Sequence, residues 1–203
     1  MDPAWQTCLT LCLDAINSGS LGIAATVHDS TGAAISRGRN QLFDTCSSPN
    51  AIKNTLVSHA EVNAIAGLPN EYRSDKSVVM YTSVEPCPMC LGAIAMSPIR
   101  QVVIGSRDPY AGSAALVDNH PWMKRKNIRF QFMSGDVETL FASLHIYSLL
   151  QRRDLPLNHG FYTSIQERYP EVYDNMVTRR DDAELGEAIR SHDVGRVKEI
   201  CAV

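Results

Sequence analysis

The segment over residues 77–104 constrains the fold of this chain more than any other. Residues 77–84 (S-V-V-M-Y-T-S-V) are a short apolar run rich in valine, which is typical of a buried strand. The helix predicted over residues 86–96 enters through prolines and stops at Ser97-Pro98. A further strand is predicted over residues 101–104. Because one helix separates the two strands, the segment predicts a right-handed βαβ unit whose strands are parallel.

The neighbouring segments extend this unit into a layered domain. Residues 5–17 have the amphipathic pattern of a helix, and Ser-Gly follows them. Residues 23–29 and 33–37 are strand-like and flank Ser-Thr-Gly, which predicts a hairpin. Residues 127–132 are a fifth strand candidate, and residues 137–153 have the pattern of a long amphipathic helix. Together they predict an α/β fold, a three-layer α/β/α sandwich around a mixed five-stranded sheet.

A joint at residues 155–160 (L-P-L-N-H-G) predicts where this domain ends. Residues 1–153 are expected to form the α/β domain and residues 154–203 a helical C-terminal extension, with candidate helices at 181–191 and 193–202. That helix pair is similar to one ankyrin-type hairpin, but a single unit of this kind cannot bury its own core. We therefore expect the extension to dock on the domain.

Composition narrows the class of protein. The chain has 203 residues and a formal net charge of −3, which gives no general attraction to nucleic acid or to anionic membranes. No run approaches the roughly 20 apolar residues of a membrane span, and the first residues lack the basic region of a secretory signal. We expect a cytoplasmic protein. In that reducing compartment the six cysteines indicate metal binding, catalysis or core packing rather than disulfides.

Two of these cysteines open the helix that follows the buried strand, in the stretch E-P-C-P-M-C. Cys87 and Cys90 are spaced i, i+3, so their sulfur atoms can converge on one point. The unpaired N–H groups and the dipole at a helix N-terminus favour thiolates over thiols. Two thiolates at this spacing suit zinc, which takes about four tetrahedral ligands at roughly 2.0–2.3 Å.

His59 is the candidate third ligand, because it opens another predicted helix, residues 59–67, after a long polar loop at 41–57. If both helices begin at the same edge of the sheet, His59 reaches the two cysteines. Three protein ligands leave the fourth position for water, which is typical of a catalytic zinc site. Bound zinc lowers the pKa of water from about 15.7 toward 7. Glu61, two residues further on, can lean over the open position and transfer protons.

Other interpretations stay open at this point. A C-x-x-C that opens a helix after a strand is also the arrangement of thiol oxidoreductases. A structural zinc site would need a fourth ligand, for which Cys8, Cys12, Cys46 and Cys201 are available. The first two lie at i, i+4 on the apolar stripe of the first helix, where core packing is expected. A non-catalytic zinc-binding scaffold is a further alternative, although it would have no need of Glu61.

The two motifs together form a known signature. H-A-E at residues 59–61 and P-C-P-M-C at residues 86–90, with a strand between them, match the pattern H-x-E…P-C-x-x-C of the zinc deaminases. The chain thus resembles the cytidine-deaminase-like superfamily, in particular its branch of guanine deaminases and bacterial tRNA adenosine deaminases. The resemblance covers residues 5–153 and is sharpest over residues 58–65 and 81–94.

This resemblance implies a role for each motif residue. His59, Cys87 and Cys90 would hold zinc, and Glu61 would be the proton shuttle. The implied reaction is hydrolytic: a zinc-bound hydroxide attacks the amino-bearing ring carbon of a nucleobase-like heterocycle, Glu61 protonates the ring nitrogen and the amine, and ammonia leaves. Domains of this family pair through the helices near the zinc, so a homodimer is expected by analogy.

Substrate-binding residues are expected outside the motifs. By resemblance, Asn40 in G-R-N-Q would hydrogen-bond the substrate ring, and Glu85 would offer backbone groups near the leaving ammonia. Asp108, in the loop after the fourth strand, would border the substrate entrance. Gly22-Ile23 stands where relatives have Val-Gly or Phe-Gly, so one pocket wall is altered. From the sequence itself, Trp122 is our candidate for the aromatic face on which a base stacks.

The choice of substrate depends on the rest of the chain. The residues of the motifs are very similar to those of guanine deaminases, and the extension can cover the site. Both features favour a small heterocyclic base as substrate, with guanine as the first candidate and cytosine or triazine-type bases as further candidates. The aromatic residues that could form such a cover, or could simply dock the extension, are Phe161, Tyr162, Tyr169 and Tyr173. The alternative is a tRNA-specific adenosine deaminase that makes inosine. It would need a basic track, for which residues 124–126 (K-R-K) and Arg129 are the candidates.

Overall fold

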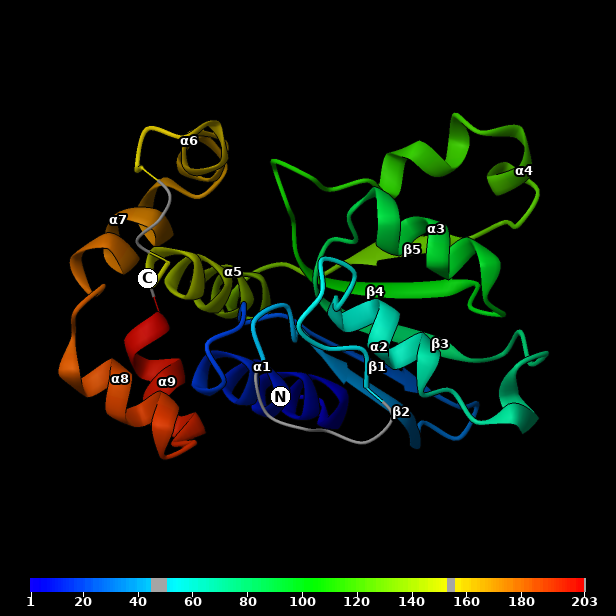
Figure 1. Cartoon of the computed structure of the whole chain (residues 1–203), viewed down its shortest axis with the longest axis horizontal. Coiled ribbons are helices and arrows are strands. Elements are labelled where there is room, and N and C mark those ends of the chain that lie inside the picture. Colours follow the sequence, from blue (N-terminus) through cyan, green and yellow to red (C-terminus); the bar gives the residue numbers. More distant parts are fainter. Residues whose placement is uncertain (45–50, 153–155, 203) are drawn as a thin grey trace.

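A mixed five-stranded sheet forms the centre of the molecule (Figure 1). The computed structural model describes residues 1–44, 51–152 and 156–202. The strands lie in the order β2-β1-β3-β4-β5. Their bounds are Ala24–His28 (β1), Ala34–Arg39 (β2), Val79–Val84 (β3), Gln101–Ser106 (β4) and Arg129–Phe132 (β5). The predicted three-layer α/β/α sandwich is thereby confirmed, with its five strands close to where the sequence places them.

The strand directions follow from the connections. The tight turn between β1 and β2 makes them antiparallel, and β1 is also antiparallel to β3. Helix α3 (Pro88–Met96) links β3 to β4, and these two strands are parallel, with Met80 opposite Val102. β5 is parallel to β4. The predicted βαβ unit is confirmed, so the carboxyl ends of β3 and β4 lie at the same edge of the sheet.

Helices cover both faces of this sheet. α2 (Ala60–Ala66) and α3 pack with Met80 and Val102 on one face. α1 (Pro3–Asn17) and α5 (Asp136–Leu150) pack against Tyr81 and Val103 on the other. Shorter elements are η1 (Asn70–Tyr72), η2 (Ala114–Asp118) and α4 (Pro121–Lys124). In the described part of the chain no helix has both the length and the apolar character that crossing a membrane requires.

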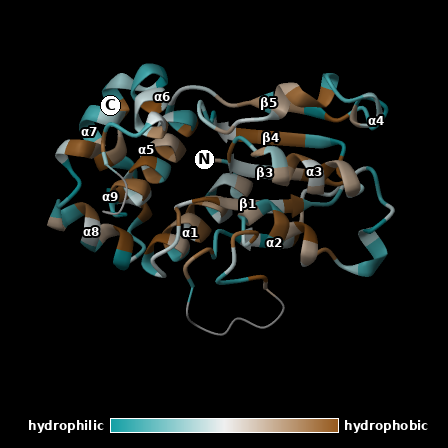
Figure 2. Ribbon diagram, turned by 45° about the horizontal axis from the view of Figure 1, so that its top comes forward, coloured by the Kyte–Doolittle hydropathy of each residue, from teal (hydrophilic) through white to brown (hydrophobic). Residues whose placement is uncertain are grey.

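Four further helices gather around α5, and Figure 2 shows hydrophobic segments on them and on α5. They are α6 (Gly160–Arg168), α7 (Pro170–Thr178), α8 (Ala183–Arg190) and α9 (Val194–Cys201). α8 and α9 match the predicted pair, whereas the sequence did not resolve α6 and α7. Phe141 of α5 and Tyr162 of α6 belong to one continuous hydrophobic core. The domain boundary at residue 153 stays a prediction.

Gly38 in β2 allows α2 to lie close against the sheet. A Cβ atom here would collide with the carbonyl oxygen of Ala60 and the backbone nitrogen of Ala64. Because both are backbone atoms, no side-chain rotation relieves the clash. We expect Gly38→Ala to lower the free energy of unfolding by about 1–3 kcal/mol, the usual cost of overpacking. Urea denaturation measures this change.

Gly92 in α3 provides the control, since a Cβ atom there would meet nothing within 4 Å. Gly92→Ala should leave the free energy of unfolding unchanged or raise it by up to about 1 kcal/mol, because alanine favours the helix interior. If Gly38→Ala proved as stable as Gly92→Ala, the close packing of α2 on β2 would be contradicted.

Candidate metal centre and active site

Three potential metal ligands meet where α2 and α3 begin. His59 is the residue before the first turn of α2, and Cys87 holds the same place before α3. Both have extended backbones, with φ −78°, ψ 156° and φ −70°, ψ 171°. The Nδ1 atom of His59 lies 3.6 Å from the Sγ atom of Cys87 and 3.5 Å from that of Cys90.

These separations fit one tetrahedral zinc ion. Ligand atoms about 2.0–2.3 Å from zinc at tetrahedral angles stand about 3.3–3.8 Å apart. The three ligand atoms all lie within 4.8 Å of one another. One imidazole and two thiolates are also a donor set that zinc prefers over magnesium or calcium. His59, Cys87 and Cys90 are therefore suited to hold zinc, as the sequence predicted.

The charges of the site agree with this assignment. Interaction with the Cys90 thiol, aided by a hydrogen bond with His59, lowers the pKa of Cys87 to about 4 despite burial. The same interaction with Cys87, together with burial, raises the pKa of Cys90. The hydrogen bond to Cys87 also raises the pKa of His59. Cys87 is thus a thiolate at neutral pH, which is the form that binds a metal.

Glu61 lies beside the ligands, in the first turn of α2. Its side chain is only 3% exposed, and its Oε2 atom accepts a hydrogen bond from the Sγ atom of Cys90 at 3.3 Å. Burial raises the pKa of Glu61. A buried carboxyl group with a raised pKa next to a metal site can both accept and donate a proton. The role of Glu61 as proton shuttle stays a prediction, with which its place beside the ligands is compatible.

A cavity of about 140 Å³ opens in front of these groups. The zinc-site layer contributes His59, Glu61 and Cys87, whereas α5 contributes residues from the other face of the sheet. The lining residues are Leu21, Ile23, Asn40, His59, Glu61, Val84, Glu85, Cys87, Asp108, Ala111, His145, Leu149 and Phe161. The cavity thus combines a metal centre, several polar side chains and apolar walls, which is the composition of a small-molecule site.

Three predicted substrate-binding residues line this cavity. Asn40 is 1% exposed, and among the described residues its Nδ2 group has no hydrogen-bond partner. Glu85 is half-buried, burial raises its pKa, and its Oε1 atom accepts from the Ala114 N–H at 3.2 Å. Asp108 accepts through Oδ1 from the N–H groups of Tyr110 and Ala111, each at 3.0 Å. An unpartnered buried donor such as Asn40 Nδ2 is costly unless a ligand satisfies it.

The structure does not place Trp122 at the cavity. Trp122 belongs to α4, where it packs against the core on the α3 face of the sheet. The ammonium group of Lys126 lies over its ring, 4.3 Å from the centroid. In Figures 1 and 2, α4 lies at the opposite end of the molecule from α6 to α9. The expectation of a stacking face at Trp122 is therefore corrected: the aromatic ring that lines the cavity is Phe161.

The C-terminal helices supply this wall and brace the loop beside it. Phe161 of α6 makes ring contacts with Tyr110 and His145, at centroid distances of 5.4 and 6.0 Å. The Tyr169 hydroxyl accepts from the Arg107 N–H and donates to Glu138 of α5, both at 2.8 Å. Because Arg107 directly precedes Asp108 in the chain, α6 and α7 fix one side of the cavity.

His145 and Leu149 are cavity residues that the sequence reasoning missed. They stand four residues apart in the second half of α5, so they share one face of that helix. In the sequence they form part of an apolar helical pattern, and nothing local distinguishes them from core positions. Only the docking of α5 beside the ends of β3 and β4 brings this face to the zinc site.

The remaining cysteines do not join the site within the described residues. Cys8 and Cys12 are fully buried in the core, and Cys8 contacts Thr26 at 3.6 Å. Cys201 is buried on α9, beside Ser143. Cys46 lies outside the described residues, as does part of the loop at 41–57. Three protein ligands leave one tetrahedral position open, which is typical of catalytic zinc. The involvement of His59 with both sulfurs argues against a simple thiol redox pair.

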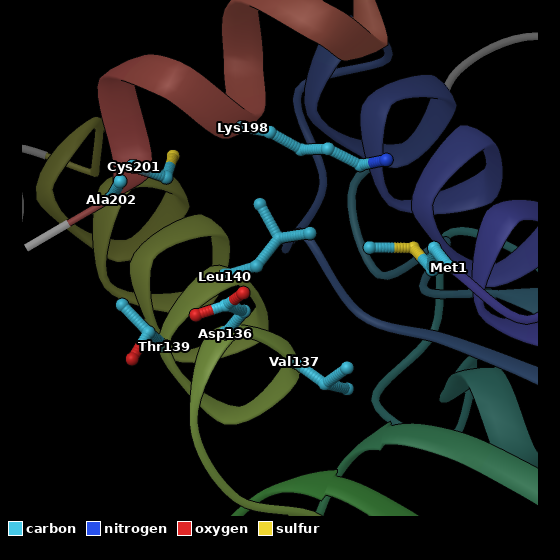
Figure 3. A pocket seen from close by; sticks show the side chains of 8 residues that line it. All are labelled: Met1, Asp136, Val137, Thr139, Leu140, Lys198, Cys201 and Ala202. Atoms are coloured by element: carbon cyan, nitrogen blue, oxygen red, sulfur yellow. The ribbon is translucent and has the colours of Figure 1, made fainter.

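A second hollow, of about 380 Å³, lies between α5 and α9 (Figure 3). It is lined by Met1, Asp136, Val137, Thr139, Leu140, Lys198, Cys201 and Ala202. It contains one acid, one lysine and one thiol, but no imidazole and no pair of thiols. None of the motif residues reaches it. The cavity at the start of α2 and α3 is therefore the candidate active site.

Comparison with known proteins agrees with this geometry. A guanine deaminase from Bacillus subtilis is 34% identical over 114 residues, covering 55% of this chain and 67% of that protein. A tRNA(Ile)-lysidine synthase from Deinococcus radiodurans is 32% identical over 154 residues, covering 71% of this chain and 24% of that protein. The chain thus spans two thirds of one relative and a quarter of the other.

The fold and the family are also matched. A structure solved in a study of A-to-I editing by tRNA:A34 deaminases superposes with a TM-score of 0.56 at 22% identity, covering 70% of this chain and 97% of that one. The model of the cytidine and deoxycytidylate deaminase zinc-binding region matches residues 3–106, which contain the three ligands and Glu61. With half of the chain matched and the complete metal centre inside the match, the chain belongs to the zinc-dependent cytidine and deoxycytidylate deaminase family.

Proposed function

We propose that this chain hydrolytically deaminates a free, amino-substituted nucleobase-like heterocycle, with guanine-type bases as the first candidates. The observation that carries the proposal is the small cavity lined by two of the zinc ligands, His59 and Cys87, together with Glu61 and Phe161. At about 140 Å³, it is well below the roughly 300–1,000 Å³ of sites for drug-sized ligands. A single heterocycle suits this volume better than a nucleotide within a folded RNA.

The side chains of the cavity account for the steps of such a reaction. Zinc, when held by His59, Cys87 and Cys90, supplies a Lewis acid and water that ionises near neutral pH. Glu61 carries a proton between water and the heterocycle, for which its burial and raised pKa are suited. Asn40 donates from Nδ2 to an acceptor of the ring and so orients it.

The other residues that line the cavity would assist the release of ammonia and hold the base. Backbone groups of Glu85, which lines the cavity, would lie near the leaving ammonia, and one oxygen of its carboxylate accepts from the Ala114 N–H. Phe161 and Leu149 exclude water from the base, and an aromatic ring such as that of Phe161 offers it a stacking surface. Desolvation of the site strengthens the hydrogen bonds that hold the base.

The second candidate is a tRNA-specific adenosine deaminase. It is supported by the basic run at residues 124–126 with Arg129, and by relatives such as the tRNA-specific adenosine deaminase of Bacillus subtilis, 35% identical over 63 residues. The patch lies on α4 and β5, and none of its residues lines the cavity. A track for RNA should lead to the zinc site, so we favour the free base.

Ammonia release from a panel of substrates tests the proposal. The zinc-loaded chain should release ammonia from guanine, cytosine or a related free base. It should release little from adenosine or from a tRNA with adenosine at the wobble position. Inosine in the tRNA without turnover of any free base would replace the proposal with the second candidate. No ammonia from any of them would favour the scaffold alternative.

We also propose a cytoplasmic homodimer. A reducing compartment keeps the sulfur atoms of Cys87 and Cys90 from oxidising to a disulfide, so that both can bind zinc. Near the zinc helices, Leu56, Val57 and Met96 are 86%, 46% and 75% exposed, which leaves apolar surface for a partner copy. Sedimentation velocity should report a particle of twice the 22.4 kDa protomer mass. A single species at the protomer mass at micromolar concentration would contradict pairing.

A further inference from the structure

His145 is a buried polar side chain that the proposed mechanism does not use. It is 6% exposed, comes from α5 and lines the cavity. Among the described residues neither of its ring nitrogens makes a hydrogen bond; the Ser148 hydroxyl donates to its backbone carbonyl oxygen. Its ring contacts Phe161 at a centroid distance of 6.0 Å. The ring nitrogens of His145 are therefore available to a ligand in the cavity.

His28 shows how this chain treats a buried histidine that has a structural role. It is also 6% exposed, but its Nδ1 atom pairs with the Gly32 carbonyl oxygen and its Nε2 atom with the Thr26 hydroxyl, each at 3.0 Å. His145 has the same burial and lacks these partners. His145 therefore lacks the hydrogen bonds that give His28 a structural role.

The protonation state of His145 defines what it can bind. Burial lowers its pKa, although the nearby Asp108 carboxylate opposes this. The imidazole is therefore neutral at pH 7, and it presents one N–H donor and one acceptor nitrogen. Asp108 uses Oδ1 for two backbone N–H groups, and within the described residues its Oδ2 atom makes no hydrogen bond. Both side chains line the cavity, so together they offer a ligand a donor and an acceptor.

We infer that His145 and Asp108 together recognise the –NH–C(=O)– edge of an amino-oxo heterocyclic base, with the His145 N–H donating to the oxo oxygen and Asp108 accepting from the ring N–H. This inference rests on the proposed function and specifies its substrate class. Guanine and cytosine carry such an edge as well as an amino group, whereas adenine has no oxo group. His145 comes from the layer opposite to the zinc helices, so it meets a part of the ring other than the reacting carbon.

Matched pairs of bases isolate the oxo group. Guanine and 2-aminopurine form one pair and cytosine and 4-aminopyrimidine the other; each pair shares the amino group and differs at the –NH–C(=O)– edge. Binding is measured by calorimetry on the full-length, zinc-loaded chain carrying Glu61→Gln, so that no base is consumed. The comparison is made in that background with and without His145→Phe, which keeps an aromatic ring but removes both nitrogens.

We expect His145→Phe to weaken binding of guanine or cytosine by about 10–100-fold, the loss expected when a buried hydrogen-bond partner is removed. Its effect on the partner that lacks the oxo group should be less than about 3-fold. His145→Gln, which retains a donor and an acceptor, should recover part of the affinity. His28→Gln is the control: it changes a buried histidine outside the cavity and should leave the ratio within each pair unchanged.

The outcomes separate this inference from the proposed function. An equal loss of affinity for both members of each pair, or no loss, would mean that His145 only lines the cavity, and would overturn the inference. So would a chain that binds neither oxo base. If the pairs behave as expected but the chain with Glu61 intact releases no ammonia, the inference holds and the proposed function fails. If ammonia is released and the ratios do not change, the inference alone fails.

Discussion

Glu61→Gln should lower kcat at least 10²-fold while the protein keeps its zinc. A positioned acid–base group contributes about 10²–10⁴-fold to a proton-transfer reaction, and glutamine keeps the shape of the side chain but cannot carry a proton. Glu61 is 3% exposed, and its Oε2 atom lies 3.3 Å from the Cys90 sulfur. No other carboxyl group among the described residues is both in the cavity and in contact with a candidate metal ligand.

The measurement combines ammonia release with zinc content. Glu61→Gln should contain one zinc per chain by elemental analysis and should bind its base with little change in affinity, since the residue acts on the proton and not on the ring. Glu184→Gln on α8, where the side chain pairs with Arg196 on the surface, is the matched control and should turn over like the unmodified chain. Unchanged kcat in Glu61→Gln would remove Glu61 from the mechanism.

The metal centre could be predicted from the sequence because its geometry is local. The i, i+2 spacing of His59 and Glu61 is unfavourable on a regular helix face. His59, however, precedes the first turn with an extended backbone, so it is free of that spacing. Cys87 likewise precedes the first turn of α3 with an extended backbone. Each helix start is marked by its own residues. The two starts lie at one edge because α2 follows β2, α3 follows β3, and both strands are antiparallel to β1.

The part of the cavity formed by α5 and α6 could not be predicted in the same way, because it depends on contacts between segments distant in the chain. His145 belongs to an apolar helix, and Phe161 follows a loop after which the sequence showed no clear helix. The α6–α7 junction at Tyr169-Pro170 interrupts the helical pattern there. Trp122 seemed the natural stacking ring on composition, but the short α4 places it against the core on the α3 face. A residue's type did not reveal its place in the fold.

The second large effect is expected from Cys87→Ala, which should abolish both zinc binding and turnover. Cys87 is the thiolate of the site at neutral pH, with its pKa lowered to about 4 by its interactions with Cys90 and His59. Without it, one imidazole and one thiol remain, which is too few ligands for a tetrahedral zinc site. Activity should fall below detection, and the zinc content should fall well below one per chain.

Thermal unfolding then tests whether Cys87→Ala is inactive because it has lost the metal and not because it has unfolded. A ligand that binds only the folded state stabilises it by about 4 kcal/mol at 1,000 times its dissociation constant. The melting temperature of the unmodified chain should therefore fall on treatment with a chelator. Cys87→Ala should start from a lower melting temperature and not respond to the chelator at all.

Cys201→Ala supplies the matched control, because it removes another buried thiol, on α9, outside the zinc cavity. That variant is destabilised only by the lost packing, and it should keep its zinc, its turnover and its response to the chelator. A Cys87→Ala protein that still bound one zinc, or a Cys201→Ala protein that lost it, would mean that the ion is held elsewhere.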